Sequence, residues 1–203
     1  MKQVNILTLF ASVLVLTLSG CRHSAPADDS PVREIPLNAP AGRAVAAFAS
    51  GCFWCTEHIF EAVVGVDSAV SGYAGGHVKD PTYELVNTET TGHAESVLVY
   101  YDPNVVSHEE LVKVFFLSHD PTTANRQGPD VGSSYRSILF YQTPDEKALA
   151  EKAIHGFQSS FPNPIVTEVK SLDAFYRAEG YHQDYIHHHP NVPYVVRVSI
   201  PRF

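Results

Sequence analysis

Apolar residues recur along the chain at two spacings, one typical of strands and the other typical of helices. Short apolar runs bounded by polar or glycine-rich stretches predict strands at 44–49, 66–73, 95–101, 137–141 and 165–169. Apolar positions three and four residues apart predict helices over 52–63, 107–118 and 144–158. No internal repeat is visible in this pattern.

Two of the predicted helices carry a start signal. Ser107 is followed three residues later by Glu110, and Thr143 is followed in the same way by Glu146. Each pair matches a capping box, in which a hydroxyl and a carboxylate satisfy backbone N–H groups of the first turn. Pro144 occupies the first helical position of the second of these helices, where its missing N–H costs nothing.

The order of elements predicts the fold class. From residue 44 to residue 141 the order is strand, helix, strand, strand, helix, strand. This order is typical of an α+β fold, a two-layer α/β sandwich with a ferredoxin-like split β-α-β core and helices on one face of a mixed sheet. From Ala178 onward there is little periodicity, which predicts an irregular C-terminal wrap. With 203 residues and 44% hydrophobic content, one domain is expected, and we assign it to 41–203.

The first forty residues follow a different pattern. Lys2 precedes an apolar stretch over 6–18, which is typical of a secretory signal and is too short for a transmembrane helix. The stretch ends in Leu-Ser-Gly-Cys at Cys21, which resembles a bacterial lipobox, where the cysteine is lipidated and becomes the mature N-terminus. We therefore expect a lipoprotein signal peptide at 1–20, a lipid anchor on Cys21, and a flexible Ala-, Pro-, Asp- and Ser-rich tether at 21–40.

The net charge and the predicted cellular location restrict the classes of binding partner. A formal net charge of −8 argues against a nucleic-acid partner, because phosphate binding needs a basic patch and none is visible. The signal predicts a bacterial cell envelope location, lipid-anchored and facing the periplasm or the exterior. Arg22 after the lipobox does not resemble an inner-membrane retention signal, which favours the outer membrane. We expect a monomer.

The cysteines single out a reactive pair. If Cys21 is lipidated, only Cys52 and Cys55 remain, so no structural disulfide framework exists. Cys52 opens a predicted helix after Ser50-Gly51. There the helix dipole and unpaired N–H groups favour thiolate, so we expect a lowered pKa for Cys52 and assign it as the nucleophile.

The spacing of Cys52 and Cys55 leaves several interpretations open. Three residues apart, the two sulfurs share one helical face and could form a disulfide after modest movement. The pair could be a thioredoxin-type redox pair, half of a zinc site completed by His182 or by 187–189, or a chance pairing. Haem attachment is excluded, because Thr56 stands where that motif requires histidine.

A set of motifs in fixed order resembles the A-type peptide methionine sulfoxide reductase family. The resemblance covers about 44–185, and its motifs are GCFW at 51–54, GYAGG at 72–76, PTY at 81–83, TGHAE at 91–95, FF at 115–116, HDPT at 119–122, NRQGPDVG at 125–132, SYRS at 134–137 and YHQ at 181–183. So many motifs in the order of the family do not arise by coincidence.

The resemblance implies a role for each matching residue. Cys52 corresponds to the nucleophile that attacks the sulfoxide sulfur, and Glu95 to the acid that protonates the oxygen, which requires a desolvated carboxyl with a raised pKa. The remaining implied roles are hydroxyls bonded to the oxygen at Tyr83 and Tyr135, a hydrophobic wall for the methyl group at Phe53 and Trp54, and a polar position that binds ordered water or substrate at Asp130. His182 lies near the pocket in relatives and receives no chemical step. Without the resemblance, the aromatic and carboxyl positions would read as ordinary core and ion-pair residues.

The sequence departs from the commonest family pattern at Cys55. Many relatives have glycine there and carry recycling cysteines near the C-terminus, whereas this chain has no cysteine after Cys55. We therefore hypothesise that Cys55 is the resolving thiol, which condenses with the Cys52 sulfenic acid to a disulfide. A thioredoxin or thioredoxin-like protein is the expected reductant, and oxidised proteins, peptides or free methionine sulfoxide are the expected substrates. We expect no metal and no cofactor.

Two other functions remain as alternatives. A general thiol–disulfide oxidoreductase would use the Cys52–Cys55 pair but has no need of Glu95, Tyr83 or Tyr135. A non-catalytic surface lipoprotein that binds metal through 187–189 would need neither cysteine as a nucleophile.

Overall fold

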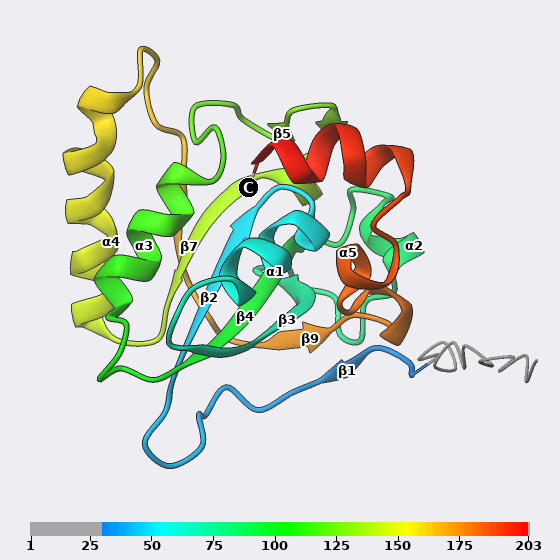
Figure 1. Cartoon of the computed structure of the whole chain (residues 1–203), viewed down its shortest axis with the longest axis horizontal. Helices are drawn as coiled ribbons and strands as arrows, with labels where there is room; N and C mark the ends of the chain where they lie inside the picture. The colour runs from blue at the N-terminus through cyan, green and yellow to red at the C-terminus, as the bar shows by residue number, and fades with distance from the viewer. Residues whose placement is uncertain (1–29, 203) are drawn as a thin grey trace, which may run out of the picture.

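A seven-stranded mixed sheet forms the centre of the structure, a computed structural model in which residues 30–202 are described (Figure 1). Its strands are β1 (Arg33–Glu34), β2 (Ala44–Ser50), β3 (Val66–Ala74), β4 (Ala94–Tyr101), β7 (Ser137–Tyr141), β8 (Glu168–Ser171) and β9 (Phe175–Arg177). A separate small pair is formed by β5 (Arg126–Gln127) and β6 (Asp130–Val131). The α-helices are α1 (Phe53–Glu61), α2 (Tyr83–Val86), α3 (His108–Leu117), α4 (Pro144–Phe157) and α5 (Tyr185–His188).

The centre of the sheet is a ferredoxin-like core. Its spatial order is β1-β9-β3-β4-β2-β7-β8, and β3, β4, β2 and β7 are antiparallel to their neighbours within it. Because β4 lies between β2 and β3, the β2-α1-β3 segment is a split β-α-β unit. The pair of β7 and β8 is parallel, which makes the sheet mixed. The predicted α+β class and split core are confirmed.

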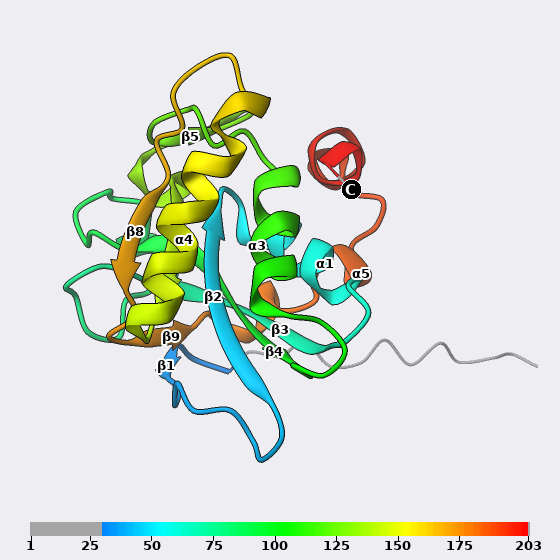
Figure 2. The ribbon, with the colours of Figure 1, turned by 90° about the vertical axis from the view of Figure 1, so that its left-hand side faces the viewer.

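Both faces of β2 are buried, which explains its uninterrupted apolar sequence. On one face Ala46 and Phe48 pack with residues of α1, α3 and α4 in the larger core cluster. On the other face Val45, Ala47 and Ala49 pack in a second cluster that contains no residue of these three helices. The helices therefore cover one face of the sheet, as predicted, and α3 and α4 run side by side (Figures 1 and 2).

The predicted helix starts are largely as expected. The Ser107 hydroxyl accepts a hydrogen bond from the Glu110 N–H at 3.2 Å, and the Glu110 carboxylate accepts one from the Ser107 N–H at 2.8 Å, so the first capping box is complete. At the start of α4 the Thr143 hydroxyl accepts from Glu146 N–H, but the Glu146 carboxylate accepts from Gln142 N–H instead. The second box is therefore shifted by one residue on its carboxylate side.

The N-terminal tether prediction needs a correction for residues 30–40. β1 pairs with β9, the Ser30 carbonyl accepts from Gly180 N–H at 2.9 Å, and Ile35 and Leu37 pack on the second core cluster. The apolar side chains of Ile35 and Leu37 pack on the face of the sheet that the helices do not cover, so this part of the segment is part of the folded domain. The predicted signal peptide at 1–20, the anchor at Cys21 and the rest of the tether lie outside the described residues.

The C-terminal region is more regular than predicted. The strand expected at 165–169 runs from Glu168 to Ser171, because Val166 N–H bonds to the Pro121 carbonyl and pairing with β7 begins only afterwards. Beyond β9, the expected irregular wrap contains α5, a π-helical turn at Val195–Ser199, and 3-10 turns at 180–182 and 200–202. Single turns of this length leave no periodic signal in a sequence.

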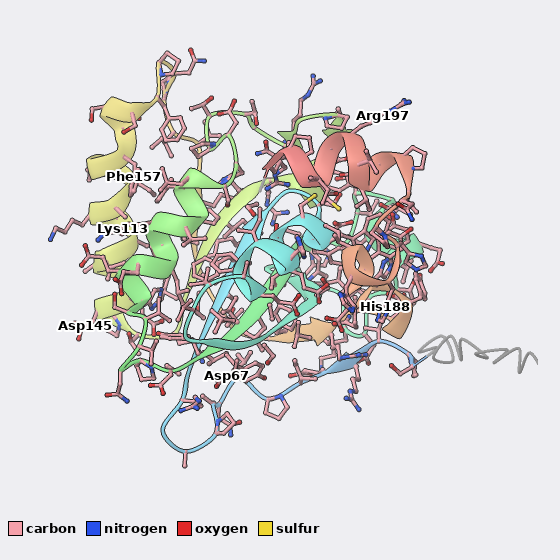
Figure 3. All side chains as sticks on the ribbon, in the orientation of Figure 1. Asp67, Lys113, Asp145, Phe157, His188 and Arg197 are labelled. Atoms are coloured by element: carbon pink, nitrogen blue, oxygen red, sulfur yellow. The ribbon has the colours of Figure 1, made fainter. Side chains whose placement is uncertain are left out.

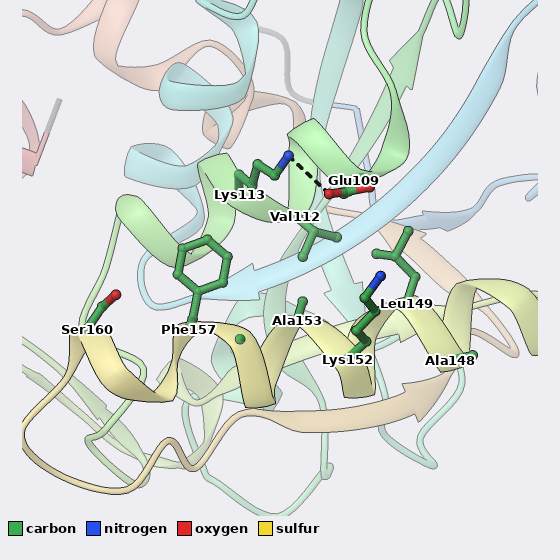
Figure 4. A pocket seen from close by; sticks show the side chains of 10 residues that line it. Glu109, Val112, Lys113, Ala148, Leu149, Lys152, Ala153, Phe157 and Ser160 are labelled. Carbon is green, nitrogen blue, oxygen red and sulfur yellow. Dashed lines mark ion pairs between the residues drawn. The ribbon is translucent and has the colours of Figure 1, made fainter.

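A groove lies between α3 and α4 and is lined by residues other than the catalytic ones predicted above (Figure 4). It encloses about 520 Å³ and is lined by residues of the two helices, among them Val112, Leu149 and Phe157. Lys113 and Glu109 form an ion pair of 3.0 Å at its rim.

Within residues 30–202, no helix has the length and apolar character needed to cross a membrane.

Candidate active site

One small cavity gathers nearly all of the side chains that the sequence had singled out. It measures about 180 Å³ and lies where the start of α1 meets β4, α2 and the loop around β6. Its lining consists of Cys52, Phe53, Trp54, Tyr83, Glu95, Asp130, Tyr135 and Tyr194. Seven of these eight residues were predicted, and the eighth, Tyr194, was not.

Cys52 lies at the N-terminal end of α1, as predicted. Gly51 makes the turn between β2 and α1 with φ +90°, and a side chain there would collide with Gln127. Cys52 is the N-cap residue and only 5% of it is exposed. The chain therefore places the sulfur at the floor of the cavity and not on an open surface.

The predicted lowering of the Cys52 pKa is wrong. Burial raises the pKa of the Cys52 thiol well above its usual value, and its hydrogen bond to Cys55 and the nearby Glu95 add to the rise. The N–H group expected to stabilise the thiolate is engaged elsewhere, because Phe53 N–H donates to Glu95 Oε2 at 2.9 Å. Desolvation opposes and exceeds the helix-end effect here.

Cys55 lies one turn further along α1 and behind the cavity wall. It is 1% exposed, and its Sγ is 3.1 Å from Ser199 Oγ. Its pKa is lowered to about 6, first because it accepts the hydrogen bond from Cys52 and then because Arg202 is near. Of the two thiols, the inner one, Cys55, is therefore the more readily ionised. Both cysteines are free thiols in the structure.

Glu95 has the environment that an acid catalyst needs. It is the second residue of β4, is 2% exposed and faces Cys52 across the cavity. Burial raises the pKa of Glu95 to about 8, with further contributions from Asp130 and Cys55, against the lowering effect of the Phe53 N–H. The carboxyl is therefore protonated at neutral pH and can donate a proton.

Two tyrosine hydroxyls complete the polar side of the cavity. Tyr83 opens α2 and Tyr135 ends a 3-10 turn at 133–135. Burial raises the pKa of both phenols, so both remain hydrogen-bond donors at neutral pH. The turn that carries Tyr135 is held by Glu89, whose carboxylate accepts hydrogen bonds from the N–H and the hydroxyl of Ser134 at 3.1 and 3.0 Å.

Phe53 and Trp54 form the apolar side of the cavity, and the Trp54 ring is fixed from behind. Tyr185 stacks on the indole with ring centroids 3.6 Å apart and an interplanar angle of 6°. The indole N–H donates to His182 Nδ1 at 3.1 Å. His182 is buried and its pKa is lowered to about 4 by burial, so the imidazole is neutral and able to accept. His182 thus fixes the orientation of the Trp54 ring in the wall of the cavity.

Asp130 and Tyr194 form a hydrogen-bonded pair at the mouth of the cavity. The Tyr194 hydroxyl donates to Asp130 Oδ2 at 2.5 Å, and Tyr194 also meets the Trp54 ring edge-on at 6.0 Å. Burial raises the pKa of Asp130, while the bond from Tyr194 lowers it. Sequence reasoning missed Tyr194, since it lies in an aperiodic segment outside the recognised motifs. Its only sequence signal is an aromatic flanked by apolar residues in 192–196.

The histidines near the C-terminus do not assemble a metal site in this part of the chain. Within residues 30–202 no three His, Cys, Asp or Glu side chains gather so that they could hold a metal ion. His182 is engaged with Trp54, and His187 and His188 pack against each other with ring centroids 5.5 Å apart. The zinc interpretation of the Cys52–Cys55 spacing therefore finds no ligand set here.

Comparison with known proteins agrees with this geometry. A family model described as peptide methionine sulfoxide reductase matches residues 44–202. The chain is 49% identical over 158 residues to peptide methionine sulfoxide reductase MsrA of Sulfolobus acidocaldarius. The aligned region covers 78% of this chain and 90% of the relative. The structure resembles methionine sulfoxide reductase A of Corynebacterium diphtheriae, with a TM-score of 0.73, 31% identity and coverage of 83% and 88% of the two chains. It also resembles Mxr1 from Saccharomyces cerevisiae in complex with Trx2, with a TM-score of 0.53, 28% identity and coverage of 74% and 89%.

Proposed function

The chain belongs to the peptide methionine sulfoxide reductase family and is a peptide-methionine (S)-S-oxide reductase, and from this premise we propose which residues carry each step. The observation that carries the proposal is the joint presence of the Cys52 thiol and the protonated Glu95 carboxyl in one cavity of about 180 Å³. A thiol nucleophile and a carboxylic acid are the two groups that a sulfoxide needs for attack at sulfur and proton transfer to oxygen.

In the first step, the Cys52 thiolate attacks the sulfoxide sulfur while Glu95 donates its proton to the oxygen. The bond that forms joins the Cys52 sulfur to the substrate sulfur, and the S–O bond breaks as the protonated oxygen leaves as hydroxide. Hydroxide then attacks the Cys52 sulfur, the bond between the two sulfurs breaks, methionine leaves as the thioether, and Cys52 is left as sulfenic acid. Tyr83 and Tyr135 hydrogen-bond to the oxygen as charge develops on it. Phe53 and Trp54 hold the methyl group of the substrate, and the cavity is of a size that suits this small apolar group.

The raised pKa of Cys52 fits this step when the substrate completes the site. Before the reaction, Glu95 is neutral and therefore does not repel a thiolate at Cys52. Glu95 becomes a carboxylate only after it has given its proton to the sulfoxide oxygen. The resting thiol is therefore protected from oxidants and becomes reactive within the complex.

In the second step, Cys55 resolves the sulfenic acid and a thioredoxin-type protein reduces the resulting disulfide. Cys55 is one turn from Cys52 and makes a hydrogen bond with it. A structural relative of this chain, Mxr1, has been observed with Trx2, which supports a thioredoxin-like reductant for this chain. Asp130 and Tyr194 would orient water or substrate at the cavity mouth.

The test is an epimer-resolved reduction assay on the purified protein. With dithiothreitol, we expect the S epimer of methionine sulfoxide to be consumed and the R epimer to remain, and we expect Cys52→Ser to be inactive. With thioredoxin and its reductase, Cys55→Ser should lose multiple turnovers. Reduction of a disulfide substrate but not of the sulfoxide would instead identify a general thiol–disulfide oxidoreductase.

The same proposal includes the cellular location of the enzyme. The lipobox-like ending at Cys21 supports a lipid anchor in a bacterial envelope, with the catalytic domain facing the periplasm or the exterior, where a thioredoxin-like reductant on the same side would serve it. Metabolic labelling with palmitate should mark the protein, and Cys21→Ala should abolish the label. Label that persists in Cys21→Ala would contradict the anchor.

A further inference from the structure

The C-terminal turn of the chain covers Cys55. Its π-helical turn at Val195–Ser199 and the 3-10 turn at Ile200–Arg202 lie against the start of α1, and Figure 2 shows this segment end-on beside the top of α3. Ser199 is 3% exposed, and its hydroxyl oxygen is 3.1 Å from Cys55 Sγ. When that sulfur is ionised, the hydroxyl can donate to it, and a hydrogen bond to the charged form favours that form.

Arg202 brings a positive charge to the same place. Its Nη2 donates to the Ser50 carbonyl at 2.9 Å and its Nε donates to the Ser118 carbonyl at 3.2 Å. Its Nη1 lies 3.6 Å from the position that a Cβ would take on Gly51. These hydrogen bonds are to neutral carbonyl groups, so they fix the guanidinium behind the Cys52 turn without cancelling its charge.

The groups that face Cys55 have opposing effects on its charge. The hydrogen bond from Cys52, the guanidinium of Arg202 and the hydroxyl of Ser199 lower the pKa of Cys55, whereas burial and the carboxyl of Asp130 raise it. The other titratable neighbours coupled to this sulfur are Glu95 and Tyr194, and both are neutral at pH 7 because burial raises their pKa.

We propose that Ser199 and Arg202 are positioning residues of the resolving step, which hold the Cys55 sulfur as an anion beside Cys52. This inference rests on the proposed function, in which Cys55 is the resolving thiol. The Cys55 thiolate attacks the sulfenic sulfur of Cys52, the S–S bond forms, and the S–O bond breaks. Hydroxide leaves and takes up a proton to become water, so that the sulfenic sulfur is reduced as Cys55 is oxidised.

The same arrangement assists the reductant. Cys52 lines the cavity, whereas Cys55 is covered by Ser199, so an external thiolate reaches the disulfide at Cys52. Attack at Cys52 expels Cys55, and a thiol with a low pKa leaves faster. The C-terminal turn therefore stabilises the same anion as nucleophile in one step and as leaving group in the next.

The experiment compares two rates in the full-length chain carrying Cys21→Ala, so that no third thiol takes part. After mixing with one equivalent of methionine-S-sulfoxide, rapid quenching and mass spectrometry give the rate of methionine formation and the rate at which sulfenic acid becomes disulfide, from pH 5 to pH 9. The variants are Arg202→Gln, Arg202→Lys and Ser199→Ala. The matched control is Arg197→Gln, because Arg197 lies on the same segment but points into solvent (Figure 3).

We expect the disulfide-forming rate of the parent to rise with pH and to level off above the midpoint at which Cys55 becomes ionised, because the thiolate is the attacking form. Arg202→Gln and Ser199→Ala should move this midpoint upward, so that a shift of one pH unit slows the step about tenfold at pH 5. The slowing should exceed any change in methionine formation. Arg202→Lys should restore most of the profile, and Arg197→Gln should match the parent.

Three outcomes are decisive. An unchanged midpoint in Ser199→Ala and Arg202→Gln overturns the inference, and if Arg202→Gln fails to fold, Ser199→Ala and Arg202→Lys decide. If Cys55→Ser stalls as sulfenic acid while those variants keep the parent profile, the proposed function stands and only this inference fails. If Cys55→Ser turns over normally with thioredoxin, the proposed resolving role is wrong and the inference falls with it.

Discussion

Replacing Glu95 with glutamine tests the acid catalyst while leaving its packing nearly intact. The Glu95 carboxyl is buried and its Oε2 accepts the Phe53 N–H at 2.9 Å, which a glutamine carbonyl can also accept. Glutamine has no proton to transfer. General acid catalysis contributes about 10²–10⁴-fold to a rate, so Glu95→Gln should lower kcat/KM for the sulfoxide by that factor at pH 7.

The raised pKa of Glu95 also predicts how pH acts on activity and stability. A rise from 4.5 to about 8 corresponds to about 5 kcal/mol at roughly 1.4 kcal/mol per pH unit. Because the folded state holds this proton to higher pH than the unfolded chain does, stability is highest below about pH 4.5 and is lost as pH rises to about 8. In Glu95→Gln the share of this loss that Glu95 causes should be absent, while the share of Glu57, whose pKa is also raised to about 8, remains. The variant should therefore be the more stable one above pH 8.

The assay combines pre-steady-state methionine formation with urea unfolding from pH 5 to pH 9. The first-turnover rate of the parent should fall on the alkaline side as Glu95 ionises near pH 8, and the Glu95→Gln profile should lack this limb. Glu57 provides a matched control, since it is 2% exposed and burial raises its pKa to about 8, yet it lies outside the cavity. A loss of activity in Glu57→Gln equal to that in Glu95→Gln, or a loss below about threefold in Glu95→Gln, would refute the reasoning.

Three further outcomes follow from the contacts of the site and core. Tyr135→Phe removes one donor to the developing oxyanion and should lower kcat by about 10²-fold in the same assay, with little change in urea midpoint. Glu89→Ala frees the turn that carries Tyr135 from the bonds to Ser134 and should also lower kcat, and wild-type rates would show that the turn holds without it. Gly72→Ala puts a Cβ 2.3 Å from the Tyr176 carbonyl and should destabilise the sheet by about 2 kcal/mol or more in urea, unless β9 can move away.

The sequence was most informative where local chemistry decides structure. Ser107 and Glu110 predicted the start of α3 because a capping box needs no distant partner. The same holds for Cys52 at the start of α1. The cavity residues from distant segments, such as Glu95 and Asp130, could be brought together only through the family resemblance, because spacing does not reveal which loops meet above a sheet.

The failures share a different physical origin. The direction of the Cys52 pKa shift depends on burial and on the hydrogen bond that diverts the Phe53 N–H, and neither is visible in a sequence. Tyr194 and Ser199 lie in single helical turns without periodicity, so their approach to the cysteines could not be predicted. The short strand β1 is formed by two residues, too few for any alternation to appear.

We propose that one sulfoxide is reduced at Cys52 and that the oxidised sulfur is then resolved by Cys55. The most direct test is peptide mass spectrometry of the Cys21→Ala chain after one turnover on methionine-S-sulfoxide without reductant. We expect one equivalent of methionine per chain and a Cys52–Cys55 disulfide, with no alkylatable thiol. Methionine formed alongside a lasting sulfenic acid at Cys52 and a free thiol at Cys55 would contradict the resolving step, and no methionine at all would contradict the nucleophile.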